Sequence, residues 1–198
     1  MTAISIVCFV VWLYFLKIGY RSQLGFFTFV WGSVGLFVIM MVWIRPAVSV
    51  PFSQLVASVS GVVGQATHLY ESYAQLGILF VPNAKSASIS LYIDLECSGI
   101  IEIMAFTAMI WFFPVYKTIE KLAINIVAII WIFAANILRV FIICMMVYYY
   151  GSGVFYLAHS IIGRLVFYAL SIILYFLVFT KSQIVRQKVG GFSYAGDH

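Results

Sequence analysis

The sequence contains little charge. Only 9% of its 198 residues are Asp, Glu, Lys or Arg, whereas 65% are hydrophobic. A soluble domain carries about 25% charged residues, so the composition excludes a soluble globular protein and predicts an integral membrane protein. The net charge of +5 does not indicate nucleic-acid binding, because the basic residues lie in short stretches between and after the apolar runs. Basic residues in such places orient helices in a bilayer.

Cysteine is also scarce, with three in the chain. They form no CxxC pair and no metal-ligand spacing, which disfavours a thiol oxidoreductase and suggests neither a metal nor an organic cofactor. Cys8 and Cys144 lie in apolar runs and are interpreted as small buried hydrophobic residues. Cys97 differs, because it follows Asp94 and Glu96 in a polar stretch. It is the one thiol whose surroundings suggest chemistry.

Runs of about 20 apolar residues predict membrane-spanning helices. The pattern predicts a single all-α membrane domain over residues 1–198, with the second span ending at Arg45 and Pro46. Residues 52–69 mix apolar residues with Ser, Gln, Thr and Gly, which favours an interfacial or re-entrant helix; a sixth span is the alternative. The five predicted spans cover residues of about 3–18, 25–44, 98–116, 121–148 and 160–179.

A β-hairpin is predicted within the segment 47–96, directly before Cys97. Residues 86–96 alternate strictly between polar and apolar types, and a turn-like stretch at 82–85 separates them from the apolar run 76–81. Period-two alternation beside a turn indicates a hairpin with one buried face. The backbone N–H and C=O groups along the edges of an open hairpin find no hydrogen-bond partners in hydrocarbon, so the hairpin should lie at the membrane surface.

The basic residues predict the orientation. If residues 47–69 do not cross, three groups of Lys and Arg fall on one side, which the positive-inside tendency makes cytoplasmic. The N-terminus is then outside, the tail 181–198 is cytoplasmic, and the protein lies in the plasma membrane with Cys97 at the extracytoplasmic face. These groups comprise Lys17 and Arg21, Lys117 and Lys121, and Lys181, Arg186 and Lys188.

The same topology brings two further reactive side chains to this face. Arg139 lies near the outer end of the fourth span, and His159 opens the fifth. A thiol is activated by a neighbouring base or cation; His159 suits proton transfer, and Arg139 suits stabilisation of a thiolate or an oxyanion. Asn136 shares a helix face with Arg139 and could orient it or donate to the same oxyanion. Glu102, a carboxylate within a span, is expected to pair with Arg139 or His159.

These residues resemble the motifs of the exosortase/archaeosortase family of multi-pass membrane cysteine transpeptidases. The resemblance covers residues 76–179, and this chain looks most like the compact form of Gram-positive bacteria. It implies that Cys97 is the nucleophile and Arg139 and His159 its partners, with Asn136, Glu96, Ser98 and Gly99 supporting them. The motifs are Glu96-Cys97-Ser98-Gly99 before an apolar helix, Asn136-Ile137-Leu138-Arg139, and His159 with Gly163 four residues later.

The resemblance also implies the substrate. Members of the family cleave C-terminal sorting signals, which consist of a short motif, an apolar helix and a basic tail. The new carboxyl group passes through a thioester to an acceptor, an amine or a lipid- or glycan-linked group. The expected partners are therefore a tailed membrane substrate, the acceptor and the bilayer, with no nucleic acid. The alternative is a non-enzymatic membrane scaffold or small transporter, in which Cys97 would tolerate replacement by Ala.

Overall fold

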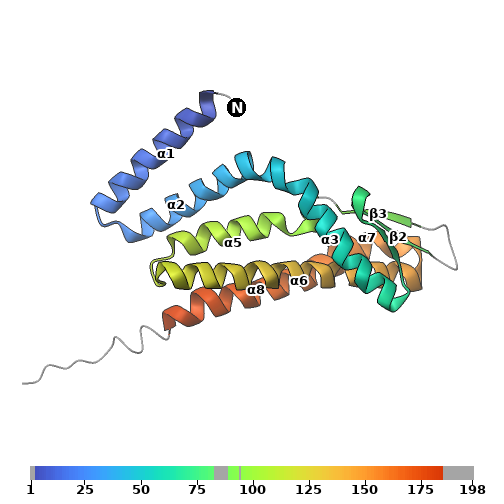
Figure 1. Ribbon diagram of the computed structural model, residues 1–198. Helices are drawn as coiled ribbons and strands as arrows, with labels where there is room; N and C mark the ends of the chain where they lie inside the picture. Colours follow the sequence, from blue (N-terminus) through green and yellow to red (C-terminus); the bar gives the residue numbers. More distant parts are fainter. Residues whose placement is uncertain (1–2, 83–88, 94, 185–198) are drawn as a thin grey trace, which may run out of the picture.

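The computed structural model describes residues 3–82, 89–93 and 95–184, leaving out the side chains of residues 3–5, 95 and 96. The described part is mainly helical and carries one small sheet (Figure 1). The helices are α1 (Ala3–Arg21), α2 (Gly25–Ile39), α3 (Arg45–Thr67), α4 (Leu95–Ser98), α5 (Ile100–Phe112), α6 (Thr118–Tyr150), α7 (Phe155–Leu157) and α8 (Gly163–Tyr175). The strands are β1 (Glu71–Tyr73), β2 (Ile78–Val81) and β3 (Ile89–Tyr92).

Short π-helical and 3₁₀ turns join several helices end to end. The π turns are Met40–Ile44, Ala158–Ile162 and Phe176–Thr180, and the 3₁₀ turns are Ala74–Leu76 and Ser152–Val154. Among the described residues, three continuous helical segments are long and apolar enough to cross a membrane: Gly25–Thr67, Thr118–Tyr150 and Ser152–Ile184. The chain is thus a mainly helical membrane protein, as predicted, whereas the count of five or six crossings stays a prediction.

The helix of the second predicted span does not stop at Arg45 and Pro46. It continues through both residues to Thr67, whereas the bounds of the membrane span itself stay a prediction. Proline lacks an N–H and crowds the carbonyl four residues earlier, which normally breaks a helix. Here Pro46 lies in the first turn of α3, directly after the π turn Met40–Ile44, where the backbone hydrogen bonds have already changed register. The long helix bends where α2 passes into α3 (Figure 1).

Two further predicted boundaries differ from the structure. The third span is shorter than residues 98–116, because Gly99 turns the chain before α5 and Phe113 is extended ahead of Pro114. The residue before a proline is disfavoured in the helical region, which explains the second limit. His159 does not open the last helix. It lies inside the segment Ser152–Ile184, within a π turn.

The sheet has the order β1-β2-β3 and is antiparallel throughout. β2 and β3 pair from Ile78 opposite Tyr92 to Val81 opposite Ile89, in the region where the alternation predicts a hairpin. The connecting residues 83–88 lie outside the described part, as does Asp94. Strand β1 has no counterpart in the sequence-based prediction.

Helix α3 covers the β1 side of the sheet. The Ser72 hydroxyl donates a hydrogen bond of 2.7 Å to the carbonyl oxygen of Ala57. The Tyr70 hydroxyl donates one of 2.9 Å to the carbonyl oxygen of Ser60. Burial raises the pKa of Tyr70 to about 12, so the phenol stays neutral at physiological pH. These bonds fix the sheet on the last turns of α3.

The described core has two parts. One lies between α5, α6 and α8 and includes Phe106, Ile132 and Phe167. The other lies between α3, the sheet and the C-terminal half of α6, and it contains Cys97 and Cys144. The reactive residues predicted from the sequence therefore lie at the end of the bundle that carries the sheet.

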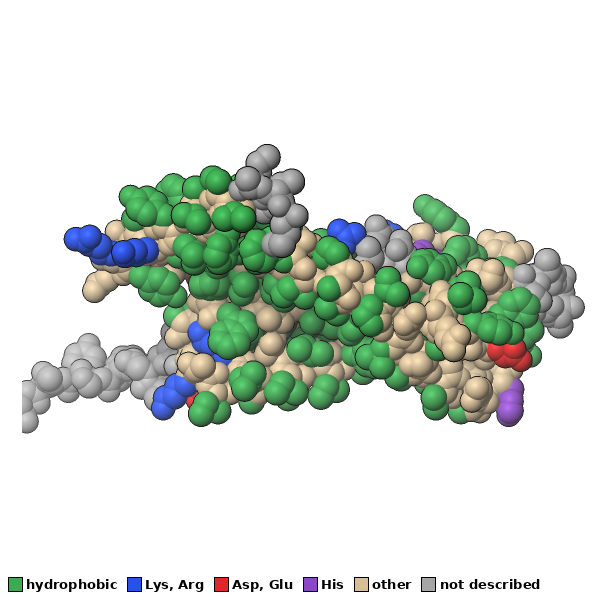
Figure 2. Space-filling model, turned by 45° about the horizontal axis from the view of Figure 1, so that its top comes forward, with side chains coloured by type: hydrophobic (Ala, Val, Ile, Leu, Met, Phe, Trp, Pro, Cys, Tyr) green, Lys and Arg blue, Asp and Glu red, His purple; other side chains and the backbone are tan. Residues whose placement is uncertain are grey.

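The opposite end carries the α1–α2 and α5–α6 connections and the end of α8 (Figure 1). Apolar side chains are spread over the whole face in Figure 2, and Lys and Arg side chains lie mainly at this end. Lys121 donates a hydrogen bond of 2.8 Å to the carbonyl oxygen of Trp111 there. This arrangement fits the predicted orientation, although which end faces the cytoplasm stays a prediction.

Candidate active site

Cys97 lies in α4, directly before a sharp turn at Gly99. The backbone of Gly99 has φ +79°, a left-handed conformation that favours glycine. The Asn136 side chain donates a hydrogen bond of 2.7 Å to the carbonyl oxygen of Cys97. Asn136 is fully buried and Cys97 is 7% exposed. The turn and the bond together fix the thiol against α6.

Arg139 places its charge beside the sulfur. Its Nη2 atom lies 3.7 Å from Cys97 Sγ, in donor geometry. The side chain is 3% exposed, and its Cζ atom lies 5.7 Å from the centre of the Phe167 ring on α8. An aromatic face attracts a guanidinium and limits its freedom, so Phe167 and the thiol hold the group from two sides.

His159 reaches the same sulfur from the last helical segment. Its Nε2 and Nδ1 atoms lie 3.6 Å and 3.9 Å from Cys97 Sγ. The residue belongs to the π turn Ala158–Ile162, and such turns often occur at functional sites because the extra residue changes which side chains face a neighbour. The Phe155 ring, 5.4 Å from the imidazole between ring centres, packs beside it.

Gly163 allows the helix that carries His159 to lie close to α6. A Cβ atom at this position would lie 2.9 Å from the Ile143 Cδ1 atom and 3.0 Å from the carbonyl oxygen of Ala158. Only a residue without a side chain fits there unless the neighbours shift. The glycine is therefore part of what brings the imidazole to the thiol.

A cleft opens beside the sulfur. Its volume is about 120 Å³, and its lining combines β3, the sheet interior, α6 and the start of the last helical segment. Most of the lining is apolar, and the reactive groups on it are Cys97 and His159. The residues lining it are Leu79, Ile89, Ser90, Leu91, Tyr92, Ile93, Cys97, Val140, Ile143, Phe155 and His159.

The predicted supporting residues take different places. Ser98 is buried, and its hydroxyl accepts a hydrogen bond of 3.4 Å from the Ile100 N–H. Glu102 lies in the first turn of α5, and its Oε2 atom is buried without a hydrogen-bond partner among the described residues, so its pairing with Arg139 or His159 stays a prediction. The side chain of Glu96 lies outside the described part.

Asn136 has a different contact from the two that were predicted. Its amide holds the backbone of the candidate nucleophile, whereas the sequence suggested the guanidinium or an oxyanion as its partner. Two other contributors were missed altogether, Phe155 and Phe167. Their aromatic character was visible in the sequence, but in a chain with 18% aromatic residues it carries little information.

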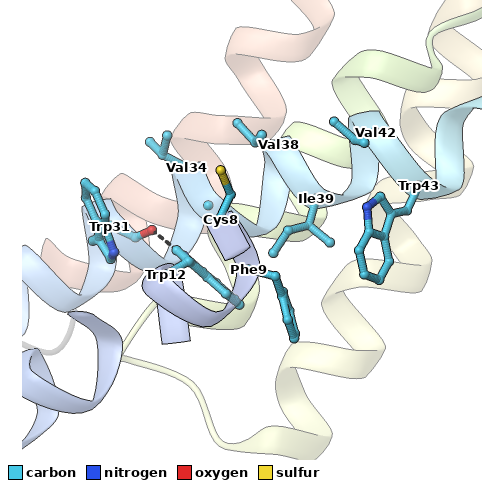
Figure 3. A pocket seen from close by; sticks show the side chains of 10 residues that line it. Cys8, Phe9, Trp12, Trp31, Val34, Val38, Ile39, Val42 and Trp43 are labelled. Atoms are coloured by element: carbon cyan, nitrogen blue, oxygen red, sulfur yellow. Dashed lines mark hydrogen bonds between the residues drawn. The ribbon is translucent and has the colours of Figure 1, made fainter. Parts of the chain in front are cut away.

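A second cleft lies away from the reactive residues, between α1 and α2 (Figure 3). Trp12 donates a hydrogen bond of 3.0 Å to the carbonyl oxygen of Trp31 across it. Cys8 lines this cleft and is exposed, so its interpretation as a buried residue was wrong: it lies on an outer, apolar face. Cys144 is fully buried, as predicted.

Comparison with known proteins identifies the family. The model of the transmembrane exosortase family (Exosortase_EpsH) matches residues 1–177, which extends the resemblance through the first 75 residues. No curated protein and no solved structure matches the chain significantly. The described residues contain no group of three His, Cys, Asp or Glu side chains that could hold a metal ion. The exosortases are membrane cysteine transpeptidases, and because the match covers most of the sequence, this chain belongs to the transmembrane exosortase family.

Proposed function

We propose that the protein is a cysteine transpeptidase that cleaves C-terminal sorting signals at the outer membrane face and transfers the new carboxyl group to an acceptor. One observation carries the proposal. Cys97 Sγ lies 3.6 Å from the imidazole of His159 and 3.7 Å from the guanidinium of Arg139, although the three residues come from separate helices. A scaffold or transporter has no need for this convergence.

In the first half of the reaction, His159 takes the thiol proton and the Cys97 thiolate attacks the carbonyl carbon of the scissile peptide bond. The carbonyl oxygen becomes an oxyanion, which Arg139 stabilises from the side of the sulfur. His159 then gives its proton to the leaving amine. The C–N bond breaks, the apolar tail departs with a new amino terminus, and a thioester remains on Cys97.

In the second half, the acceptor amine attacks the thioester carbonyl and passes a proton to His159. The C–S bond breaks and the thiolate leaves beside Arg139, whose charge stabilises it. His159 returns the proton to the sulfur, which restores the starting state. Water in place of the amine gives hydrolysis by the same steps.

The test is co-expression with a precursor, defined as a protein from the same genome that ends in a short motif, one apolar helix and a basic tail. We expect the parent enzyme to shorten the precursor and Cys97→Ala to leave it uncleaved. Mass spectrometry of the enzyme should find a precursor fragment attached to Cys97, and this fragment identifies the cleavage site. Cys8→Ala is the matched control, because its thiol is exposed and lies in the distant cleft between α1 and α2.

Normal cleavage in the Cys97→Ala variant would overturn the proposal and favour the scaffold or transporter. Loss of cleavage in Cys8→Ala would show that cysteine replacement disturbs the fold without regard to position.

A further inference from the structure

Strand β3 forms one edge of the described sheet, with β2 on its inner side (Figure 1). The Ile93 N–H donates a hydrogen bond of 2.9 Å to the carbonyl oxygen of Gly77, at the entry to β2. In an antiparallel pair, the N–H and C=O of one residue point to the same side and alternate residues point to opposite sides. The backbone groups of Ile89, Leu91 and Ile93 therefore face β2. Those of Ser90 and Tyr92 face outward.

The outward edge of β3 lies along the cleft beside Cys97. Ser90 and Tyr92 line the cleft together with Cys97 and His159. The side chains of Ser90 and Tyr92 are exposed, whereas Ile89 and Leu91 pack on the core. A row of backbone donors and acceptors thus runs beside the candidate nucleophile.

The other edge of the sheet does not offer such a site. Helix α3 packs against β1, and the Ser72 side chain donates to the carbonyl oxygen of Ala57 on that helix. A Cβ atom at Gly61 would lie 2.6 Å from the Ser72 Cβ atom, so the helix and strand are in close contact. Helix α3 thus packs against the β1 end of the described sheet, and no described helix packs on β3 to the same extent at the end next to the thiol.

We propose that the substrate segment around the scissile bond binds in extended form along β3 and adds a fourth strand to the sheet. This inference rests on the proposed function and names how the substrate is held. An unpaired strand edge binds extended peptides through main-chain hydrogen bonds, and neighbouring pockets select alternate side chains. The Ser90 and Tyr92 N–H and C=O groups supply the bonds here.

Strand addition has two consequences for the substrate. Its alternate side chains enter the apolar cleft between β3 and Phe155, while the others point to the opposite face of the sheet. The apolar lining, formed by residues such as Val140 and Ile143, favours uncharged side chains at the inward positions. Because main-chain bonds are independent of side-chain identity, the site also accepts variation at the outward positions.

Proline scanning of β3 tests the inference with the precursor defined above. Tyr92→Pro removes an outward N–H and leaves the bonds to β2, and proline is tolerated on an edge strand in that orientation. We expect Tyr92→Pro to lower the cleavage rate at least about tenfold, since it removes one bond and its ring crowds the incoming strand. Tyr92→Ala removes the same side chain and keeps the N–H, so it is the reference against which the effect of the lost N–H is measured. Equal rates for Tyr92→Pro and Tyr92→Ala would overturn strand addition.

Crosslinking gives an independent readout that does not require cleavage. In a Cys97→Ala background, Ser90→Cys is paired with single cysteines placed at successive positions before the apolar tail of the precursor. We expect disulfides at alternate precursor positions, because every second side chain of an added strand faces the same side. Crosslinks without a period of two, or none despite co-purification of the precursor, would overturn the inference.

The two levels of the proposal fail differently. If the enzyme with Cys97 intact does not process the precursor, the proposed function fails. If it processes the precursor but Tyr92→Pro and Tyr92→Ala cleave equally, or the crosslinks lack the period of two, cleavage stands and strand addition along β3 is wrong.

Discussion

Replacing Arg139 by Gln should greatly slow the reactions of Cys97. The Nη2 and Sγ atoms are 3.7 Å apart and both side chains are buried. Two unit charges at this distance attract each other by about 4 kcal/mol at an effective dielectric constant of about 20. Removal of the positive charge should therefore reduce the thiolate population by up to roughly a thousandfold, because each 1.4 kcal/mol is a factor of ten.

The assay is the alkylation of Cys97 by iodoacetamide in detergent at pH 7, followed by intact-mass spectrometry in a Cys8→Ala background. Arg139→Lys keeps the positive charge but loses the planar guanidinium group with its several N–H donors. We therefore expect near-parental alkylation of Cys97 but slower cleavage of the precursor. Asn125→Ala is the control, because it removes a buried polar residue of α6 that bonds to Thr107, remote from the thiol. Alkylation of Arg139→Gln within threefold of the parent would refute the electrostatic argument.

Three further predictions concern the scaffold of the site. Gly163→Val should separate α8 from α6 and abolish cleavage, because a Cβ atom at this position would lie 2.9 Å from the Ile143 Cδ1 atom. Gly153→Ala is the control and should cleave normally, because a Cβ atom there meets open space. Equal cleavage by the two variants would contradict the packing argument. Gly99→Ala should lower the unfolding free energy by about 1–2 kcal/mol and the melting temperature in detergent, since φ is +79°, with Gly99→Asn affected less. The pKa of Tyr70 is about 12 in the folded protein against an ordinary value of 10.0 in the unfolded chain. The contribution of the neutral phenol to the unfolding free energy is therefore fully present below pH 10 and is lost as the pH rises from 10 to 12. Tyr70→Phe should flatten this part of the melting profile, and an unchanged slope would show that another group titrates.

The residues of the candidate site could be predicted because each is unusual in its surroundings. A thiol in a polar stretch, an Arg within an apolar run and a His beside another apolar run stand out in a chain with 9% charged residues. Helix length then places Arg139 near one membrane face, and the structure brings its guanidinium to Cys97. The main apolar spans follow from composition in the same way.

The local geometry could not be predicted, because it depends on contacts between distant segments. The π turn around His159 is stabilised by packing against α6, and no residue type within Ala158–Ile162 specifies it. Strand β1 has only three residues, too few for a periodic pattern, and forms by pairing with β2. The bond from Asn136 to the backbone of Cys97 joins residues 39 positions apart.

The length of α6 has a consequence for where a substrate can be cut. This helix has 33 residues, or about 50 Å, while the hydrocarbon core of a bilayer is about 30 Å thick. Arg139 is the 22nd residue of α6, so roughly one membrane thickness separates the thiol from the basic end of the bundle. If the protein cleaves tailed membrane substrates as proposed, a substrate helix whose basic tail is held at that end would present to Cys97 the peptide bond just beyond its apolar stretch. Lengthening the stretch by one helical turn would then move the cut by about four residues.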